Sequence, residues 1–193
     1  MHSEIGLHQM DGQQEIFKMN RNNDLTHFFN SHGILVTWVD KEEAVRMWRD
    51  LFCDGITPEM KMQTPDYNEE FNWHIFSFGL VRAIEGNSAD ELFEKCCKDK
   101  VILFFENSDD AYLCENAAGL TSDTLKLLAQ NGGYSYADMY VFHPADGWTY
   151  VRTHERSLGP YYYEKANGDL WVAACELQTD KINVSENKEA KST

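Results

Sequence analysis

Val101-Ile102-Leu103-Phe104-Phe105 (VILFF) is the stretch that decides the fold. A strand with one face in water alternates apolar and polar residues, whereas this run has no polar residue at all. It therefore indicates a central strand that is covered on both faces. The polar residues 107–110 predict a turn, and residues 111–114 then predict a second strand that pairs with the first. We expect the domain to be built around this pair.

More strands are expected on either side of this pair. Residues 34–39 and 73–78 are short runs rich in β-branched and aromatic residues, which is typical of strands. Residues 139–153 predict a hairpin whose turn is Pro144-Ala145-Asp146-Gly147. Later strands are expected at residues 161–163 and 170–175.

Three helices are predicted between the strands. Asp40 and Glu43 form a capping box, and the apolar residues after it recur at helical spacing: Ala44, Val45, Trp48, Leu51 and Phe52. Ser88 and Glu91 repeat the capping pattern before a second helix. A third helix is expected over residues 122–130, before the stop signal Asn131-Gly132-Gly133. Residues 56–70 predict a long loop with one helical turn.

These elements predict a single α+β domain with a mixed or largely antiparallel sheet. About three helices are expected to pack on it, on one side. The chain of 193 residues is 42% hydrophobic and 13% aromatic, enough for one sizeable core. We place the domain at residues 24–178. The polar segments 1–23 and 179–193 are expected to be flexible tails.

Acidity is the strongest feature of the composition. The formal net charge is −15, with 32 acidic residues against 17 lysines and arginines. This charge disfavours direct nucleic-acid binding and docking to anionic membranes, and it favours a basic protein partner. The plainer alternative is that the acids only keep the protein soluble.

The acids gather in two stretches, around residues 54–70 and 106–123, that are expected to lie in or beside exposed loops. The candidate partner-binding residues are Asp66, Glu69, Glu70, Glu106, Asp109, Asp110 and Glu115. One shared negative patch would indicate a functional surface, whereas two separate patches would indicate solvated loops. The sequence leaves both possibilities open.

The cysteines favour a reducing compartment. Their odd number, five, and the absence of a CxxC motif argue against a disulfide framework and against a thiolate zinc site. The first 25 residues lack the basic and apolar segments of a secretion signal, and no run is long and apolar enough for a transmembrane helix. We therefore expect a cytoplasmic protein.

Catalytic signatures are scarce. No nucleotide-binding glycine motif and no nucleophile-elbow motif is present. Thr153-His154-Glu155 is the most enzyme-like triplet, but on a strand His154 and Glu155 would point to opposite faces. A structural role is therefore favoured over an enzymatic pocket, for which the candidate residues are Arg152, His154, Glu155, His74 and Tyr161.

The remaining histidines point to no metal site. His74 lies in an apolar run and is expected to be a hydrogen-bonded core residue. His143, at the hairpin turn, is expected to be exposed. No grouping of histidines and carboxylates has a spacing that names a metal, and no cofactor is expected.

Short motifs spread over residues 48–163 resemble those of an uncharacterised bacterial family, domain-of-unknown-function family 4275. They are Trp48, Trp73-His74-Ile75-Phe76-Ser77, Asn116-Ala117, Trp148-Thr149-Tyr150-Val151, Thr153-His154-Glu155 and Gly159-Pro160-Tyr161-Tyr162. The resemblance implies a small bacterial α+β protein. It implies no activity and no catalytic residue.

The leading hypothesis is an acidic protein-binding module. Its most plausible form is an immunity or antitoxin-type inhibitor that masks a basic toxin or nucleic-acid enzyme. One alternative is an enzyme of unrecognised type with a pocket around His154. Another is a sensor of small ligands, for which the expected evidence is an apolar cavity lined by tyrosines.

Overall fold

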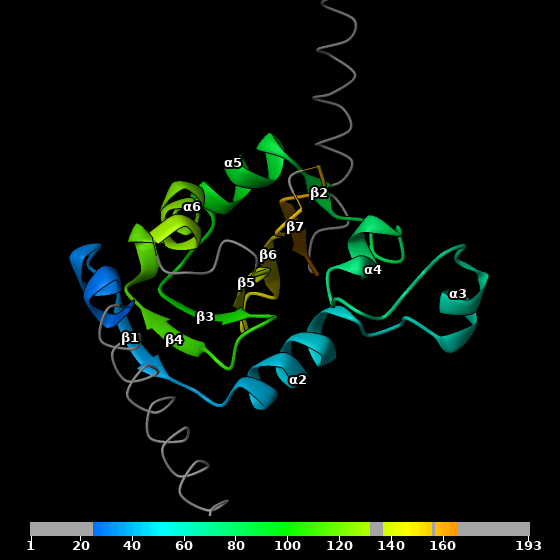
Figure 1. Ribbon diagram of the computed structural model, residues 1–193, viewed down its shortest axis with the longest axis horizontal. Coiled ribbons are helices and arrows are strands. Elements are labelled where there is room, and N and C mark those ends of the chain that lie inside the picture. Colours follow the sequence, from blue (N-terminus) through cyan, green and yellow to red (C-terminus); the bar gives the residue numbers. More distant parts are fainter. Residues whose placement is uncertain (1–24, 132–136, 156, 166–193) are drawn as a thin grey trace, which may run out of the picture.

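A computed structural model describes residues 25–131, 137–155 and 157–165 (Figure 1). Its centre is a seven-stranded sheet in the order β1-β4-β3-β5-β6-β7-β2, in which every pairing is antiparallel. The strands are β1 (Leu35–Trp38), β2 (Ile84–Glu85), β3 (Lys100–Phe105), β4 (Ala111–Glu115), β5 (Met139–His143), β6 (Trp148–Arg152) and β7 (Tyr161–Glu164). The α+β class and the antiparallel sheet predicted from sequence are confirmed.

β3 lies at the middle of the sheet, as its unbroken apolar run predicted. It pairs with β4 on one side and with β5 on the other. Val101, Leu103 and Phe105 pack into one core, whereas Ile102 and Phe104 pack into a second core on the opposite face. Successive side chains of a strand point to opposite faces, so a strand that is apolar throughout needs a cover on both.

Helices supply that cover on both faces, so the expectation of helices on one side is wrong. α5 (Asn87–Lys95), α6 (Ser122–Asn131) and the helical residues 25–31 contribute to the first core. α2 (Lys41–Phe52) and the residues around α4 (His74–Ser77) contribute to the second. The one-sided arrangement conflicts with the double apolar face of β3.

α2 follows its sequence prediction closely. The Asp40 side chain accepts a hydrogen bond from the Glu43 backbone N–H at 2.8 Å, as a capping residue does. Trp48 and Phe52 are buried in the second core. The Trp48 Nε1–H donates to Thr149 Oγ1 at 2.9 Å, which ties α2 to β6.

The predicted strand at residues 73–78 is instead the short helix α4. The Phe76 backbone N–H donates to the Trp73 carbonyl, and the Phe78 N–H donates to the His74 carbonyl, in the local pattern of a helical turn. Ile75 and Phe76 are both buried in the second core. A short helix embedded in a core has no polar face, so its sequence reads like a buried strand.

The capping role expected for Ser88 is also wrong. Gly86 holds the position before α5, with φ at 64°, and its carbonyl accepts from the backbone N–H groups of Ala89 and Asp90. No side chain caps this helix. Ser88 lies inside the first turn because the positive φ of Gly86 redirects the chain before it.

The connections complete the fold. The predicted long loop contains the short helix α3 (Pro58–Gln63), and a 3₁₀ turn, η1 (Ala117–Gly119), precedes α6. The predicted hairpin of residues 139–153 is present as β5 and β6. The strand expected at residues 170–175, the stop signal at Gly132-Gly133 and the two tails lie outside the described residues.

Candidate functional site

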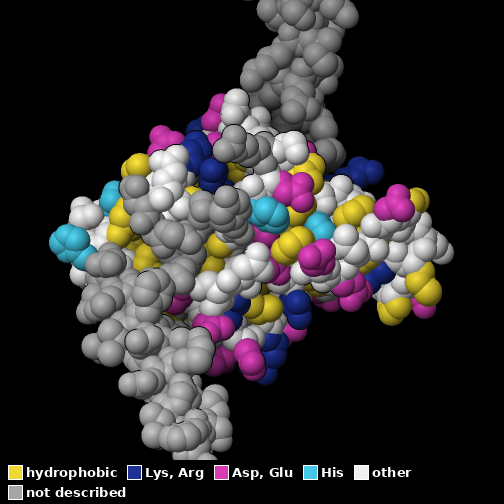
Figure 2. Space-filling view, viewed as in Figure 1, with side chains coloured by type: hydrophobic (Ala, Val, Ile, Leu, Met, Phe, Trp, Pro, Cys, Tyr) yellow, Lys and Arg dark blue, Asp and Glu magenta, His cyan; other side chains and the backbone are white. Residues whose placement is uncertain are grey.

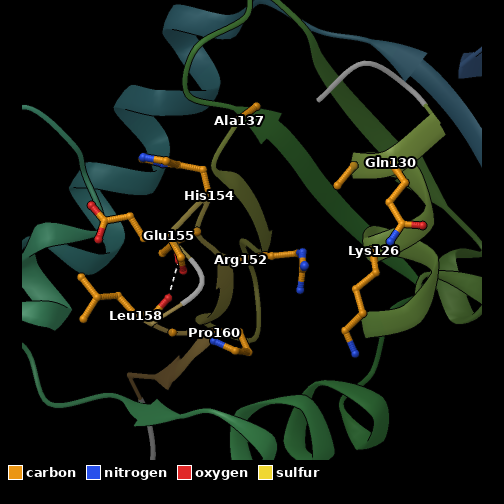
Figure 3. Close-up of a pocket in the computed structure, with 11 residues that line it drawn as sticks. Lys126, Gln130, Ala137, Arg152, His154, Glu155, Leu158 and Pro160 are labelled. Atoms are coloured by element: carbon orange, nitrogen blue, oxygen red, sulfur yellow. Dashed lines mark hydrogen bonds between the residues drawn. The ribbon is translucent and has the colours of Figure 1, made fainter. Parts of the chain in front are cut away.

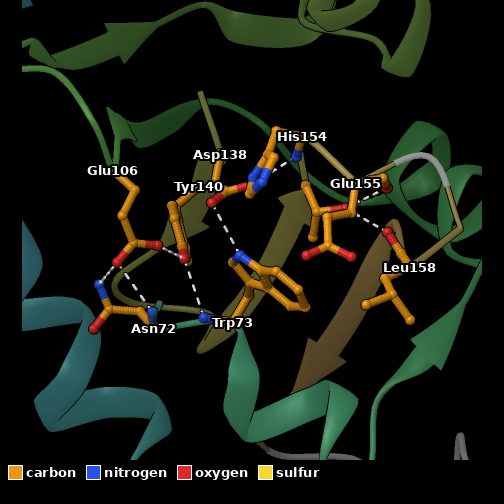
Figure 4. A network of polar contacts seen from close by, with 9 residues as sticks. Asn72, Trp73, Glu106, Asp138, Tyr140, His154, Glu155 and Leu158 are labelled. Atoms are coloured by element: carbon orange, nitrogen blue, oxygen red, sulfur yellow. Dashed lines mark hydrogen bonds and ion pairs between the residues drawn. The ribbon is translucent and has the colours of Figure 1, made fainter. Parts of the chain in front are cut away.

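A buried carboxylate, Asp138, links three segments behind the end of β6 (Figure 4). Its side chain is fully buried. Its Oδ2 accepts a hydrogen bond from Trp73 Nε1 at 2.9 Å, and its Oδ1 accepts from the backbone N–H of His154 at 2.6 Å. His154 Nδ1 lies 2.8 Å from the same Oδ1. Buried carboxylates need such partners, and Asp138 has three.

Glu106 anchors a second branch of the same network (Figure 4). Its Oε1 accepts from the Asn72 backbone N–H at 3.0 Å and from the Asn72 side-chain amide, and its Oε2 accepts from the Tyr140 hydroxyl. The Tyr140 oxygen in turn accepts from the Trp73 backbone N–H at 3.0 Å. The Glu106 N–H donates to the Asp138 carbonyl, which joins the two branches.

Burial sets the protonation of this branch. Desolvation raises the pKa of Glu106 above its usual range, although the hydrogen bonds from Tyr140 and Asn72 oppose the shift. Burial, together with the nearby Glu106 carboxylate, raises the pKa of Tyr140 well above 10.0. Desolvation also lowers the pKa of Lys41, whose ammonium donates to the carbonyls of Phe105, Glu106 and Ser108.

The network orients His154 and leaves part of its ring in solvent. Its side chain is 25% exposed, while that of Asp138 has no exposure. A buried carboxylate on Nδ1 is the arrangement that fixes the imidazole of a general base. It equally fixes the loop after β6, because the backbone N–H and the ring of His154 meet one oxygen.

Arg152, His154 and Glu155 all line one cavity, as the enzymatic alternative requires. Their side chains nevertheless diverge. Figure 3 shows the Arg152 guanidinium extending toward α6, while the His154 ring and the Glu155 carboxylate turn away from it. Glu155 comes from the loop that follows β6, not from the strand. The three groups therefore do not converge on one substrate atom in this arrangement.

The other two enzymatic candidates lie apart from this cavity. His74 is buried, and its Nδ1 donates to the Asn68 carbonyl at 3.1 Å. Its ring packs edge-on against Trp73, with centroids 4.4 Å apart. Tyr161 is buried in the second core and stacks on Trp73. Both side chains are part of the packing around Trp73.

His143 is buried, so the expectation of an exposed residue is wrong. Its Nε2 lies 2.8 Å from Asp99 Oδ1, and its Nδ1 accepts from the Asp146 backbone N–H at 3.0 Å. The partner Asp99 lies 44 residues away, just before β3. The sheet brings the two residues together, and their spacing in the sequence does not predict this contact.

The second acidic stretch is not an exposed loop surface. Asp110 is only 3% exposed, and Glu106 points into the polar network. Asp109 is exposed beside them. Glu115 is exposed at the far end of β4, about 14 Å along the strand from residue 111, and pairs with Lys100 at 3.6 Å. This stretch cannot form one continuous negative patch.

The first acidic stretch is exposed. We define the arm as residues 54–70, which includes α3. The candidate residues Asp66, Glu69 and Glu70 are all exposed there. Asn72, just after the arm, binds Glu106, so the two stretches meet at that point. Figure 2 shows acidic and basic side chains interspersed near α2, and acidic and hydrophobic side chains at the right-hand end, over α3.

Three residues of this region were not predicted from the sequence. Asp138 is a lone acid before a strand, and only its position ahead of the wholly buried β5 could have marked it. Lys126 and Gln130, on α6, line the same cavity as Arg152. They are four residues apart in the predicted helix, and this spacing indicates that both lie on one helix face.

Three of the four described cysteines behave as apolar residues, whereas Cys97 is exposed. Cys114 is buried, and burial raises its pKa to about 12. Cys53 and Cys96 are half-buried, and burial raises their pKa values to about 11 and about 12. Within the described ranges, no cluster of three histidine, cysteine or acidic residues could hold a metal ion, and no helix is long and apolar enough to cross a membrane.

A family match covers nearly all of this framework. Residues 14–162 match the family described as "Domain of unknown function (DUF4275)". The chain belongs to this family. The DUF4275 match begins well before the motifs that suggested it, and it includes β1, α2, the arm and the polar network. No curated protein and no solved structure matches the chain.

Proposed function

We propose that the chain is a protein-binding module that recognises a basic partner through the arm, residues 54–70. One observation carries this proposal: α3 buries none of its side chains, and Met62 is 78% exposed. Met60 is 38% exposed on the same helix. Figure 1 shows α3 at one end of the molecule, away from the sheet. Exposed apolar side chains on a projecting element favour a binding role.

The arm is fixed at its base, which favours binding. The Tyr67 ring packs edge-on against Phe78 with centroids 5.5 Å apart, and the Asn68 carbonyl accepts from His74. Lys61 Nζ lies 2.7 Å from Glu69 Oε1 and joins α3 to the returning chain. A surface held in one shape loses less entropy when it binds a partner.

The charge of the arm selects the kind of partner. It carries five acidic residues, all exposed, against one lysine: Asp54, Glu59, Asp66, Glu69 and Glu70 against Lys61. Methionine side chains adapt to irregular surfaces, so Met60 and Met62 can supply apolar contact inside this acidic rim. Acidic surfaces accelerate association with basic partners at low salt.

An immunity or antitoxin-type inhibitor is the form of this function that we favour. Toxins and other enzymes that act on nucleic acids bind phosphates in basic clefts. A projecting acidic arm with an apolar tip can enter such a cleft and exclude the substrate. The resulting association would weaken as salt screens the charges.

A site-specific cross-linking experiment tests the proposal. A photoreactive phenylalanine analogue is placed at Met62 in the full chain in its native host, and at Asp50 on the exposed face of α2 as the matched control. We expect a basic protein to be cross-linked from position 62 only, less efficiently at high salt, with its activity inhibited by the purified chain. Equal labelling from both positions, or an acidic partner, would exclude the arm.

An enzyme centred on His154 is the second candidate function. It is favoured by the buried Asp138 carboxylate on Nδ1, which leaves the ring partly exposed. Hydrolysis of p-nitrophenyl acetate by the chain and by His154→Gln is the test. A rate above buffer that the substitution abolishes would support the enzyme, whereas equal rates for the two proteins would remove it.

A further inference from the structure

A cavity of about 460 Å³ lies between α6 and the end of β6. Lys126 and Gln130 line it from α6, Arg152 from β6, and Leu158 and Pro160 from the segment before β7. Cavities of roughly 300–1,000 Å³ are typical of sites for small organic molecules. In Figure 1, α6 and α3 lie toward opposite ends of the molecule, so this cavity is separate from the arm.

Arg152 has an unusual environment. Its side chain is half-buried, yet its guanidinium makes no hydrogen bond or ion pair with any residue in the described part of the chain. Other basic side chains in the described part of the chain have partners. For example, Lys41 donates to backbone carbonyls, and Lys165 forms an ion pair with Asp54. A half-buried guanidinium that has no partner for its N–H donors among the described residues is unfavourable unless a ligand or water binds it.

The groups that face the cavity are suited to an anion. Figure 3 shows Arg152 extending into the space that Lys126 and Gln130 face from α6, while the Glu155 carboxylate turns away. Lys126 pairs with Asp123 at 2.9 Å and lies 3.7 Å from Asp90. Asp90 also accepts from the Tyr150 hydroxyl at 2.6 Å. Asp123 and Asp90 are therefore engaged with Lys126 and Tyr150, and no acid in the described part of the chain forms an ion pair with Arg152.

We propose that this cavity binds a small organic anion, with Arg152 as the anchor for its carboxylate or phosphate group. A planar guanidinium donates two parallel hydrogen bonds to either group. Lys126 adds charge, and the Gln130 amide adds a donor and an acceptor for the remainder of the ligand. Of the charged residues that line the cavity, Lys126 and Arg152 are basic and Glu155 is acidic, so the guanidinium of Arg152 can select an anion although the protein as a whole is acidic.

Calorimetric titration of the full chain with citrate and with inorganic phosphate, at constant ionic strength, tests this site. The comparison is between the unaltered chain, Arg152→Gln and Arg46→Gln, an exposed arginine on α2 that serves as the matched control. We expect saturable binding of at least one probe, weakened about tenfold or more by Arg152→Gln and unchanged by Arg46→Gln. The two probes distinguish a carboxylate site from a phosphate site.

A second variant tests the cavity without changing any charge. Ala129 lines it from α6, and Ala129→Leu fills part of the space. This substitution should weaken binding while Arg152 and Lys126 remain in place, and it decides the matter if Arg152→Gln misfolds. Failure of both probes to bind, or equal binding by all variants, overturns the inference. Neither result bears on the arm, which lies elsewhere.

Discussion

Asp138 has no exposed surface and accepts three hydrogen bonds, from Trp73 and from two groups of His154. These bonds join α4, the start of β5 and the loop after β6. An alanine at this position would leave the Trp73 indole N–H and the His154 donors without their acceptor. Each unsatisfied buried donor costs about 1–3 kcal/mol, so the position matters more for folding than any exposed acid.

We therefore predict that Asp138→Ala lowers the free energy of unfolding by about 3 kcal/mol or more. The reason is the loss of a fully desolvated acceptor that serves three donors. Urea denaturation followed by tryptophan fluorescence measures it. Asp50→Ala, on the exposed face of α2, is the matched control and should change stability by less than about 0.5 kcal/mol. Similar small losses for both would mean that solvent reaches the Asp138 site.

The raised pKa of Glu106 should make the free energy of unfolding depend on pH, in a direction that can be stated in advance. Its pKa is raised in the fold, chiefly by burial, so the folded chain holds the Glu106 proton more tightly than the unfolded chain. This stability is present below the ordinary glutamate pKa near 4.5 and is lost as the pH rises through the raised value. The free energy of unfolding of the natural chain should thus fall, relative to Glu106→Gln, as pH increases from 4.5.

Urea denaturation of both proteins at several pH values measures this difference. Glutamine does not titrate, and every other ionisable group is shared, so their contributions cancel to first order. A difference that stays flat with pH, or that grows in favour of the natural chain, would contradict a raised pKa at Glu106.

Sequence reasoning found half of the His154 site. The triplet Thr153-His154-Glu155 is recognisable in the sequence because histidine and glutamate are chemically versatile. Its acceptor Asp138 lies 16 residues earlier and meets it only because Met139 pairs with Arg152 in the β5–β6 register. Such contacts depend on strand register, which is set by the whole sheet. The contact of Glu106 with Asn72 could not be foreseen either, because it joins the end of β3 to a loop 34 residues earlier in the sequence.

At the scale of elements, sequence patterns predicted the structure correctly where the residues that determine an element lie within that element. The Asp40 cap and the apolar face of α2 lie within thirteen residues, and both are present, although the Glu43 side chain makes no described bond back to the Asp40 N–H. The strand prediction for residues 73–78 was wrong because this segment is embedded in the core, and that burial depends on tertiary packing rather than on local sequence. The prediction that Ser88 caps α5 was wrong because Gly86, with its positive φ, holds the capping position two residues earlier.

Two helices with side-chain N-caps should respond unequally to the loss of the cap. Asp40 caps α2, which buries Trp48 and Phe52, whereas Thr57 caps α3, which buries nothing. Asp40→Ala should lower the global free energy of unfolding by about 1 kcal/mol. Thr57→Ala should change it by less than about 0.5 kcal/mol, because α3 can unfold while the core stays intact.

Hydrogen exchange distinguishes the two cases. In Thr57→Ala, faster exchange should be confined to the amides of residues 57–64. In Asp40→Ala, faster exchange should extend to core amides, because α2 is part of the global unfolding unit. If both variants lost the same global stability, α3 would belong to that unit as well.

The whole molecule carries a large negative charge, because its 32 acidic residues outnumber its 17 lysines and arginines. The net charge is −15, and several described ion pairs are between exposed side chains, such as Lys100–Glu115 and Lys165–Asp54. Exposed pairs contribute little each. The amount of acid was evident from sequence. Its distribution was not, because Asp110 and Glu106 turned inward when the sheet formed.

Self-repulsion should therefore dominate the salt dependence of stability. We predict that the urea midpoint rises as sodium chloride increases from about 10 mM to about 200 mM, because the Debye length falls from roughly 30 Å to below 10 Å and screens like charges across the surface. Sucrose at matched osmolality is the control, since it stabilises without screening. A midpoint that falls with salt would mean that the attractive pairs outweigh the repulsion, and the acids would then be arranged for stability rather than left available for a basic partner.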